Sequence, residues 1–349
     1  MARRRSRAGP LSAWTRLATA SWKRATRAAV RQATRAARAA NSTLVRAAGK
    51  AAARRPPKRS TDGAGLAIRA GGARHFRLHC PPGVRRDAKL PLIVLLHGCR
   101  QDAQAIAAVT RMNRLADRER FLVLYPEQDR LAHSQGCWNW YETRSGRARA
   151  EAAIVQAAVD QVCRHEAVDP ARVVIAGLSA GASMAALVAT LHPARYAAVA
   201  MHSGIAPGVA HDASSALAAM SGHRRGTRDA LVTPRRPAAP ALPPLLVIQG
   251  TADTVVAPSN AREAAERWAA AAGARPDAVR RVQRGQRRVM RVTDHRVQRR
   301  LVVRLCEVEG LGHAWSGGAP GRAYSDPRGP DASRLVWSFA RAAFAARAR

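Results

Sequence analysis

The stretch Gly177-Leu178-Ser179-Ala180-Gly181 (GLSAG) decides the fold, because it separates two segments of opposite character. The run before it, ARVVIAG (171–177), is short and aliphatic, and the run after it, ASMAALVATL (182–191), is rich in helix formers. A serine between two glycines at such a junction is typical of a nucleophile elbow, where the strand and the helix come very close. The pattern predicts a reactive Ser179, and the alternative is an ordinary turn serine.

Outward from this turn, short aliphatic runs alternate with helical stretches. The strand candidates are 90–98, 121–127, 172–177, 196–204 and 244–253. The helix candidates are 103–118, 150–167, 182–191, 258–272 and a stretch from 331, where Asp331 is the predicted N-cap. Near-continuous aliphatic strands are typical of strands covered on both faces. We therefore predict an α/β fold with a mostly parallel central sheet and helices on both faces.

Two segments depart from this alternation. Residues 205–243 are rich in Gly, Pro, Ser and Arg with little periodicity, which predicts a long surface loop or lid. Residues 280–310 alternate Val, Met or Leu with Arg, which predicts β-strands that are exposed and strongly basic on one side.

A serine hydroxyl needs a base, and the base needs a carboxylate that holds it in the right tautomer. After an elbow serine, the expected chain order is an acid and then a histidine. Asp253 ends the apolar run PLLVIQGTAD, and His313 lies in the glycine-flanked GLGHAW. We predict that Asp253 and His313 complete the site with Ser179. The alternatives are a loop-capping aspartate and a structural loop histidine.

Two main-chain N–H groups are candidates for stabilising a negative carbonyl oxygen. One is that of Ala180, directly after the serine, and the other is that of Cys99 in LLHGCRQ, after an early strand. Gly98 lets the backbone approach closely there.

The segment CWNWYE (137–142) places three aromatic residues close together. Trp138 and Trp140 would form a wall for an apolar acyl chain and Asn139 a polar contact, or the three aromatics would form a cluster at the edge of the core. His202, in MHSG, is included among these substrate-site candidates, although we favour a packing or supporting role for it.

The chain carries a net charge of +36, and its first 60 residues hold 17 Lys or Arg and no acid. We predict a basic tail and linker over 1–62 and a catalytic domain over 63–349. Residues 11–48 have a tryptophan-bearing apolar face opposite arginines, as in a helix that lies on an anionic surface such as a storage granule or lipid. The alternatives are a disordered extension, a transit peptide and non-specific contact with nucleic acid.

The five cysteines include no CxxC pair, which argues against a zinc site, and we expect neither a metal nor a cofactor. Arginines interrupt the N-terminal segment too often for a secretory signal, and no run of 18 apolar residues occurs. We therefore expect a cytoplasmic protein with most of its cysteines free and buried.

The segments LPLIVLLHGCRQ, CWNWY, GLSAGASMA, MHSGIAPG, IQGTADTVV and GLGHAWSGG together resemble the polyhydroxybutyrate (PHB) depolymerase family of esterases, of the α/β-hydrolase fold, over about residues 65–345. The resemblance implies hydrolysis of a 3-hydroxyalkanoate polyester or its oligomers through an acyl-enzyme. It implies Ser179, Asp253 and His313 as the catalytic triad, and a location like that of intracellular members, which act on storage granules. Some secreted relatives bridge the cysteines that match Cys99 and Cys137, and with a cytoplasmic setting expected, the sequence leaves open whether this chain forms that bond.

A second substrate class stays open. Related enzymes that share the elbow and the HG loop act on feruloyl, acetyl-sugar or other small esters, and a fold does not determine a substrate. The sequence therefore predicts a serine esterase for polyhydroxybutyrate, with a small-ester carboxylesterase as the alternative.

Overall fold

The computed structural model describes residues 62–69, 72–85, 87–223 and 241–348. The predicted interfacial segment 11–48 and nearly all of the predicted basic tail lie outside these residues and stay predictions. Among the described residues, no helix is long and apolar enough to cross a membrane.

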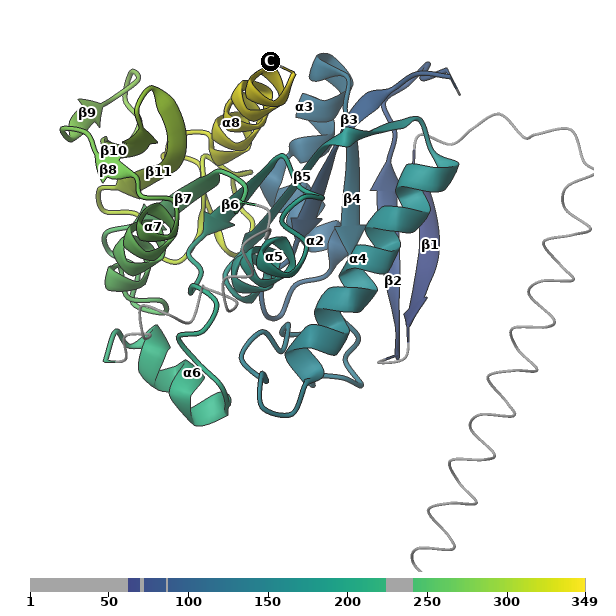
Figure 1. Ribbon diagram of the computed structural model, residues 1–349, viewed down its shortest axis with the longest axis horizontal. Coiled ribbons are helices and arrows are strands. Elements are labelled where there is room, and N and C mark those ends of the chain that lie inside the picture. The colour runs from purple at the N-terminus through teal and green to yellow at the C-terminus, as the bar shows by residue number, and fades with distance from the viewer. Residues whose placement is uncertain (1–61, 70–71, 86, 224–240, 349) are drawn as a thin grey trace, which may run out of the picture. The chain divides into compact units, whose positions relative to one another are not determined.

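One large sheet forms the centre of the described chain (Figure 1). Its strands are β1 (Asp62–Arg69), β2 (Gly72–His79), β3 (Leu90–Leu96), β4 (Leu122–Pro126), β5 (Val168–Leu178), β6 (Ala198–His202), β7 (Leu245–Gly250), β8 (Arg275–Pro276), β9 (Arg280–Val282), β10 (Met290–Val297) and β11 (Arg300–Val308). Their order is β1-β2-β4-β3-β5-β6-β7-β11-β10-β8, and β9 also pairs with β10. The central pairs from β4 to β11 are parallel, and the pairs at both edges are antiparallel.

Helices cover both faces of the sheet, as predicted (Figure 1). They are α2 (Ala103–Thr110), α3 (Met112–Glu119), α4 (Arg147–His165), α5 (Ala180–Leu191), α6 (Ala213–Met220), α7 (Ser259–Ala271) and α8 (Ala332–Arg347). Helices α4, α5 and α7 pack on one face, and α2, α3 and α8 pack on the other. A small pair, β12 (Trp315–Ser316) and β13 (Ser325–Asp326), follows the main sheet.

Alternation along β3 shows why its aliphatic run is continuous. Leu92, Val94 and Leu96 belong to the hydrophobic cluster on one face of the sheet. Ile93 and Leu95 belong to the cluster on the other, and all five side chains are fully buried. A strand between two helical layers needs apolar side chains at every position, whereas a strand with one solvent-exposed face needs them only at every second position.

The predicted capping and the predicted basic strands are confirmed. The Asp331 carboxylate accepts a hydrogen bond from the Arg334 N–H at 3.0 Å and begins α8. Strands β9, β10 and β11 occupy 280–310, and along β10 the side chains of Met290 and Val292 are buried while that of Arg291 is partly exposed.

Three expectations were wrong or incomplete. The antiparallel β1–β2 pair was not predicted, because most of β1 is exposed and carries little aliphatic signal. The predicted helix 103–118 is two helices, since Arg111 adopts a left-handed conformation with φ 52° and ends α2. The predicted loop 205–243 contains α6, and its first part is buried core, because Ile205, Ala206, Val209 and Ala210 pack on the α5 side of the sheet. Residues 224–240 lie outside the described chain.

Close contact between β5, α5 and the end of β3 explains the two glycines of the elbow. A Cβ atom on Gly177 would lie 2.3 Å from the Gly181 carbonyl, and one on Gly181 would lie 2.4 Å from the His97 carbonyl oxygen. Because these obstacles are backbone atoms, they cannot rotate away. The elbow therefore tolerates only glycine at both positions.

Replacing Gly181 with alanine is expected to lower the free energy of unfolding by about 2 kcal/mol or more, because the overlap outweighs alanine's better helix propensity of ~1 kcal/mol. Urea denaturation would measure the change. Gly63→Ala is the matched control, because a Cβ atom there would meet only Leu78 at an ordinary 3.9 Å. Equal denaturation midpoints for the two variants would contradict the packing described here.

Candidate active site

Ser179 occupies the turn between β5 and α5, as predicted. Its backbone has φ 56° and ψ −124°, a conformation that is strained for a residue with a side chain. The Ser179 N–H donates to the His202 carbonyl at 2.8 Å, which holds the turn against the end of β6. The surrounding strands and helix thus maintain a strained turn that presents the hydroxyl at the carboxyl edge of the sheet.

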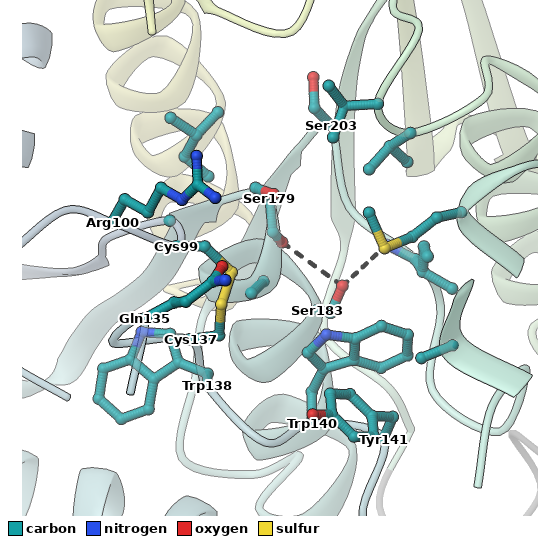
Figure 2. Close-up of a pocket in the computed structure, with 18 of the residues that line it drawn as sticks. Cys99, Arg100, Gln135, Cys137, Trp138, Trp140, Tyr141, Ser179, Ser183 and Ser203 are labelled. Carbon is teal, nitrogen blue, oxygen red and sulfur yellow. Dashed lines mark hydrogen bonds between the residues drawn. A yellow bond between two sulfur atoms is a disulfide. The ribbon is translucent and has the colours of Figure 1, made fainter. Parts of the chain in front are cut away.

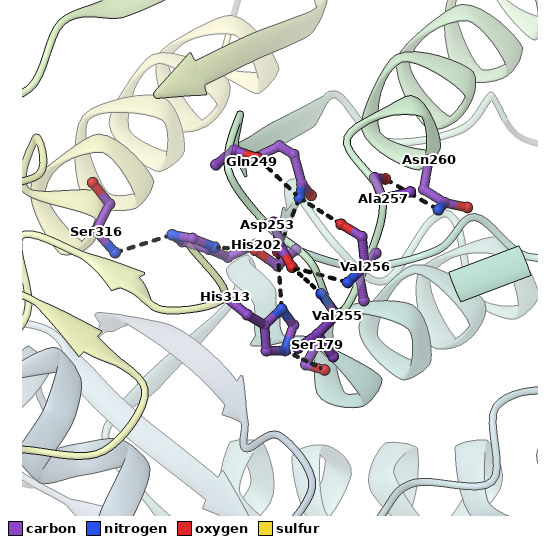
Figure 3. A network of polar contacts seen from close by, with 12 residues as sticks. Ser179, His202, Gln249, Asp253, Val255, Val256, Ala257, Asn260, His313 and Ser316 are labelled. Atoms are coloured by element: carbon purple, nitrogen blue, oxygen red, sulfur yellow. Dashed lines mark hydrogen bonds and ion pairs between the residues drawn. The ribbon is translucent and has the colours of Figure 1, made fainter. Parts of the chain in front are cut away.

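The structure brings Ser179, His313 and Asp253 together in one hydrogen-bonded chain (Figure 3). The Ser179 Oγ and His313 Nε2 atoms lie 3.0 Å apart. His313 Nδ1 and Asp253 Oδ2 lie 2.9 Å apart. With a proton on Nδ1, the ring donates to the carboxylate and accepts from the hydroxyl. This arrangement can remove the hydroxyl proton as the oxygen attacks a carbonyl carbon.

Asp253 is buried and accepts hydrogen bonds on both of its oxygens. The Val255 and Val256 N–H groups donate to Oδ1, at 3.0 and 2.9 Å, and the Gln249 amide and His313 donate to Oδ2. Burial raises the pKa of Asp253, but the hydrogen bond and charge of His313 and these backbone donors outweigh it, so the pKa is lowered overall. Asp253 therefore stays ionised and orients the imidazole.

Gly250 allows the acid loop and the histidine loop to meet. A Cβ atom on Gly250 would lie 2.1 Å from the Leu311 carbonyl oxygen, so only glycine fits at the end of β7. The Ala252 N–H donates to the same carbonyl at 3.0 Å, and the Thr251 N–H donates to the Val308 carbonyl at 3.0 Å. These contacts hold the loop that carries Asp253 against the loop that carries His313, although the two residues are 60 positions apart in sequence.

Both predicted oxyanion donors line the same cavity as Ser179 (Figure 2). Ala180 is the first residue of α5, where main-chain N–H groups have no intrahelical acceptor. Cys99 follows Gly98, and a Cβ atom on Gly98 would lie 3.4 Å from the Ser179 Cβ, so the two loops are adjacent. The residues of both predicted donors therefore lie in segments that border the serine.

The cavity at Ser179 has a volume of about 510 Å³ and a mainly apolar lining. Trp140 and Tyr141 form part of its wall (Figure 2), and Leu217 and Met220 of α6 form another part. Leu217 and Val255 both line the cavity and are 65% and 43% exposed, so the cavity opens to solvent past apolar side chains. The cavity residues within 205–243 were not predicted, because α6 is only eight residues long and its Ala-rich sequence carries little periodic signal.

Tyr324 is a further cavity residue that the sequence did not indicate. Its backbone has φ 58°, and its ring meets that of His313 edge-on with centroids 6.4 Å apart. It lies in the loop between β12 and β13, and no role in the site was predicted for it.

The predicted polar contact from Asn139 to substrate is wrong. Asn139 is 1% exposed and does not line the cavity, because its main-chain and side-chain N–H groups donate to the Glu151 carboxylate at 2.9 and 2.7 Å. Trp138 lines the cavity but is also fully buried, and its indole donates to the His97 carbonyl at 3.1 Å. Of the three residues, Trp140 best fits the predicted wall, and Trp138 and Asn139 belong to the core edge.

A buried polar cluster supports this loop and was not predicted. Glu151 and Arg74 form an ion pair at 3.1 Å, and their side chains are only 2% and 6% exposed. Gln128 bridges them, accepting from Arg74 at 2.5 Å and donating to Glu151 at 2.9 Å, and it also donates to the Cys137 carbonyl. The members are far apart in sequence, so only the folded chain shows that they act together.

His202 does not line the cavity, so its inclusion among the substrate-site residues is wrong. The structure shows the supporting role that we favoured for it. Its side chain is buried against Trp315, with ring centroids 5.1 Å apart, and its Nε2 accepts from the Ser316 N–H at 3.1 Å (Figure 3). Burial, together with the nearby His313, lowers the pKa of His202 to about 3. His202 is thus a neutral acceptor that holds the loop after His313.

Cys99 and Cys137 form a disulfide, a pairing that the sequence left open. Of the other three cysteines, only Cys306 is buried. The bond joins the loop of the predicted oxyanion donor to the aromatic loop (Figure 2).

The neutral His202 makes stability depend on pH. Its pKa in the unfolded chain is about 6.5, so unfolding takes up a proton at any pH between that value and the lowered folded value. Stability is therefore greatest above pH ~6.5 and falls as the pH falls. In His202→Gln the loss of unfolding free energy between pH 7 and 5 should be smaller by about 2 kcal/mol. Denaturant titrations at both pH values would measure this difference. If the unfolding free energy of the two proteins changed equally between pH 7 and 5, the assignment of His202 as neutral would be contradicted.

Comparison with known proteins agrees with this geometry. The family model described as esterase PHB depolymerase matches residues 74–289. Poly(3-hydroxyalkanoate) depolymerase C of Paucimonas lemoignei is 32% identical over 54% of this chain and 46% of its own length. Feruloyl esterase B of Thermothelomyces thermophilus is 28% identical over 52% of this chain and 65% of its own length.

Among solved structures, the acetyl xylan esterase from Aspergillus awamori superposes with a TM-score of 0.58 at 18% identity, covering 74% of this chain and 95% of that one. This likeness shows the shared α/β-hydrolase fold. Since the family model spans more than half of the chain, the chain belongs to the esterase PHB depolymerase family.

Proposed function

We propose that the protein is a serine esterase that hydrolyses polyhydroxybutyrate or its oligomers through an acyl-enzyme. The observation that carries the proposal is the hydrogen-bonded chain from Asp253 through His313 to Ser179, which ends in an apolar cavity. The family membership and the depolymerase relative in Paucimonas lemoignei support it.

In the first half of the reaction, the Ser179 oxygen attacks the ester carbonyl while its proton passes to His313 Nε2. The Cys99 and Ala180 N–H groups would stabilise the negative carbonyl oxygen, and Asp253 would stabilise the imidazolium. The C–O bond to the leaving alcohol then breaks, and His313 returns the proton to that alcohol. In the second half a water repeats these steps and releases a carboxylic acid, and Ser179 regains its proton.

The cavity lining favours a neutral, apolar acyl group. No carboxylate lines it among the described residues, and aromatic and aliphatic side chains dominate its wall. A hydroxyalkanoate ester has no charge along its chain and a short alkyl branch, so it can enter such a cavity without the cost of desolvating an ion. The exposed Leu217 and Val255 extend the apolar wall outward, where further units of an oligomer would lie.

A carboxylesterase for feruloyl or other small esters is the second candidate. The observation that favours it is the pair Trp140 and Tyr141, whose rings meet edge-on 5.5 Å apart in the cavity wall and could pack against an aromatic acid. Feruloyl esterase B from Thermothelomyces thermophilus supports it.

Replacing Ser179 with alanine should reduce kcat by on the order of 10⁴-fold or more, because no other group can form the acyl-enzyme. Release of 3-hydroxybutyrate from amorphous polymer, with methyl ferulate and p-nitrophenyl acetate in parallel, would measure the loss. Ser338→Ala, on the exposed face of α8, is the matched control. Unchanged turnover in Ser179→Ala would refute the mechanism, and wild-type activity on the ferulate alone would favour the second candidate.

Removing the disulfide with Cys99→Ser and Cys137→Ser together should lower kcat by about tenfold to a hundredfold with little change in KM. The reason is that a loosened Cys99 loop stabilises the transition state less well, while the cavity wall remains. Steady-state kinetics on a soluble ester would separate the two parameters. Cys163→Ser, at a free cysteine outside the cavity, is the control. A rise in KM alone would show that the bond shapes the cavity instead.

A further inference from the structure

A second large hollow lies at the opposite edge of the sheet from Ser179. Its walls come from segments just before β6 and β7, from the turn that leads into β11, and from α8, whereas Ser179 and Asp253 follow the carboxyl ends of β5 and β7. The hollow has a volume of about 810 Å³, which is within the range of small-molecule sites. Nothing in the proposed ester hydrolysis uses it.

The floor of this hollow is apolar. Phe339 and Ala343 of α8 and Ala197 before β6 are 5%, 7% and 1% exposed, so they form a surface that is continuous with the core. Leu301 of β11 and Leu242, which are partly buried, form the side walls. An aliphatic chain that lies here would remove its apolar surface from water, which favours binding.

Among the described residues, five arginines and no acid line the same hollow. Arg304 is neutralised by Asp294, to which it donates twice, at 2.6 and 2.7 Å, and Arg296 shares that carboxylate at 3.2 Å. Arg347 donates to the Tyr196 carbonyl. Arg299 and Arg300 are exposed, and within the described part of the chain neither pairs with a carboxylate. The rim therefore carries two available guanidinium groups next to an apolar floor.

Charge argues against a segment of the chain itself as the occupant. The first 60 residues hold 17 cations and no acid, and residues 224–240 hold five arginines and one aspartate. Both segments would be repelled by an arginine rim. A complementary ligand must instead carry a negative group for the rim and an apolar part for the floor, and guanidinium groups bind carboxylates in a bidentate geometry.

We propose that this hollow, between α8 and the β10–β11 turn, binds a single-chain aliphatic carboxylate. Its carboxylate pairs with Arg299 and Arg300, and its chain lies on Phe339, Ala343 and Leu301. The site is separate from the cavity at Ser179, so the proposal does not depend on the proposed ester hydrolysis.

Calorimetric titration of the full chain with decanoate would test the site, with decanol and acetate as probes that each lack one half of the ligand. We expect decanoate to bind at least tenfold more tightly than either. Arg299→Ala with Arg300→Ala should weaken decanoate binding about tenfold. Ala346→Glu, which adds a negative charge at an exposed lining position, should weaken it by a similar factor. Arg149→Ala with Arg164→Ala, two exposed arginines of α4, removes the same charge elsewhere and should leave binding unchanged.

Three outcomes would overturn the proposal. Decanoate binding that survives the Arg299 and Arg300 changes would place the ligand elsewhere, including in the apolar cavity at Ser179. Equal affinity for decanol would show that the rim plays no part, and equal affinity for acetate would show a plain anion site. Tighter binding of decyl phosphate than of decanoate would assign the site to phosphate headgroups in place of carboxylates.

Discussion

The close approach of β3, β5 and the first turn of α5 is the constraint on which the rest of the site depends. Gly177 and Gly181 allow backbone to contact backbone there, and Ser179 between them is held in a strained left-handed conformation. The strain is sustained because the surrounding sheet and helix are buried and cannot relax independently. The same contact brings Gly98, and with it the Cys99 amide, next to the serine.

Two buried polar clusters hold the remaining parts of the site on either side of this elbow. On one side, Gln249 and the main chain at Val255 and Val256 donate to the oxygens of Asp253, which in turn orients His313. On the other side, Glu151 and Arg74 hold the loop that the disulfide joins to Cys99. The hydrogen bonds within each cluster stabilise one loop in one conformation, although the Gln249 Oε1 atom is buried without a partner among the described residues. The histidine and the loop of the predicted oxyanion donor Cys99 are thus positioned separately, by groups outside the cavity.

The arginine content of the chain has different consequences at the two edges of the sheet. At the carboxyl edge, the cavity at Ser179 is mainly apolar, and Arg100 is its one arginine among the described residues. At the amino edge, several arginines surround a larger hollow, and a buried aspartate neutralises only some of them. A composition rich in arginine does not by itself say where free positive charge lies. The arrangement of Asp294 and its partners decides this, because each carboxylate neutralises the guanidinium groups that reach it.

The sequence by itself determined the alternation of strands and helices, the elbow at Ser179 and the order of Ser179, Asp253 and His313, because aliphatic runs, glycine spacing and loop position are local properties of the chain. It did not determine the β1–β2 edge, because β1 is mostly exposed. It also missed the helix break at Arg111, which depends on one left-handed residue, and helix α6, which is short and rich in Ala. Tertiary structure alone decided the role of Asn139 and of the Arg74–Glu151 pair and the neighbours of His202 and Tyr324, since each depends on a residue outside its own motif. Whether a polar side chain faces a cavity or a buried carboxylate depends on what the rest of the chain places beside it, and no local pattern records that.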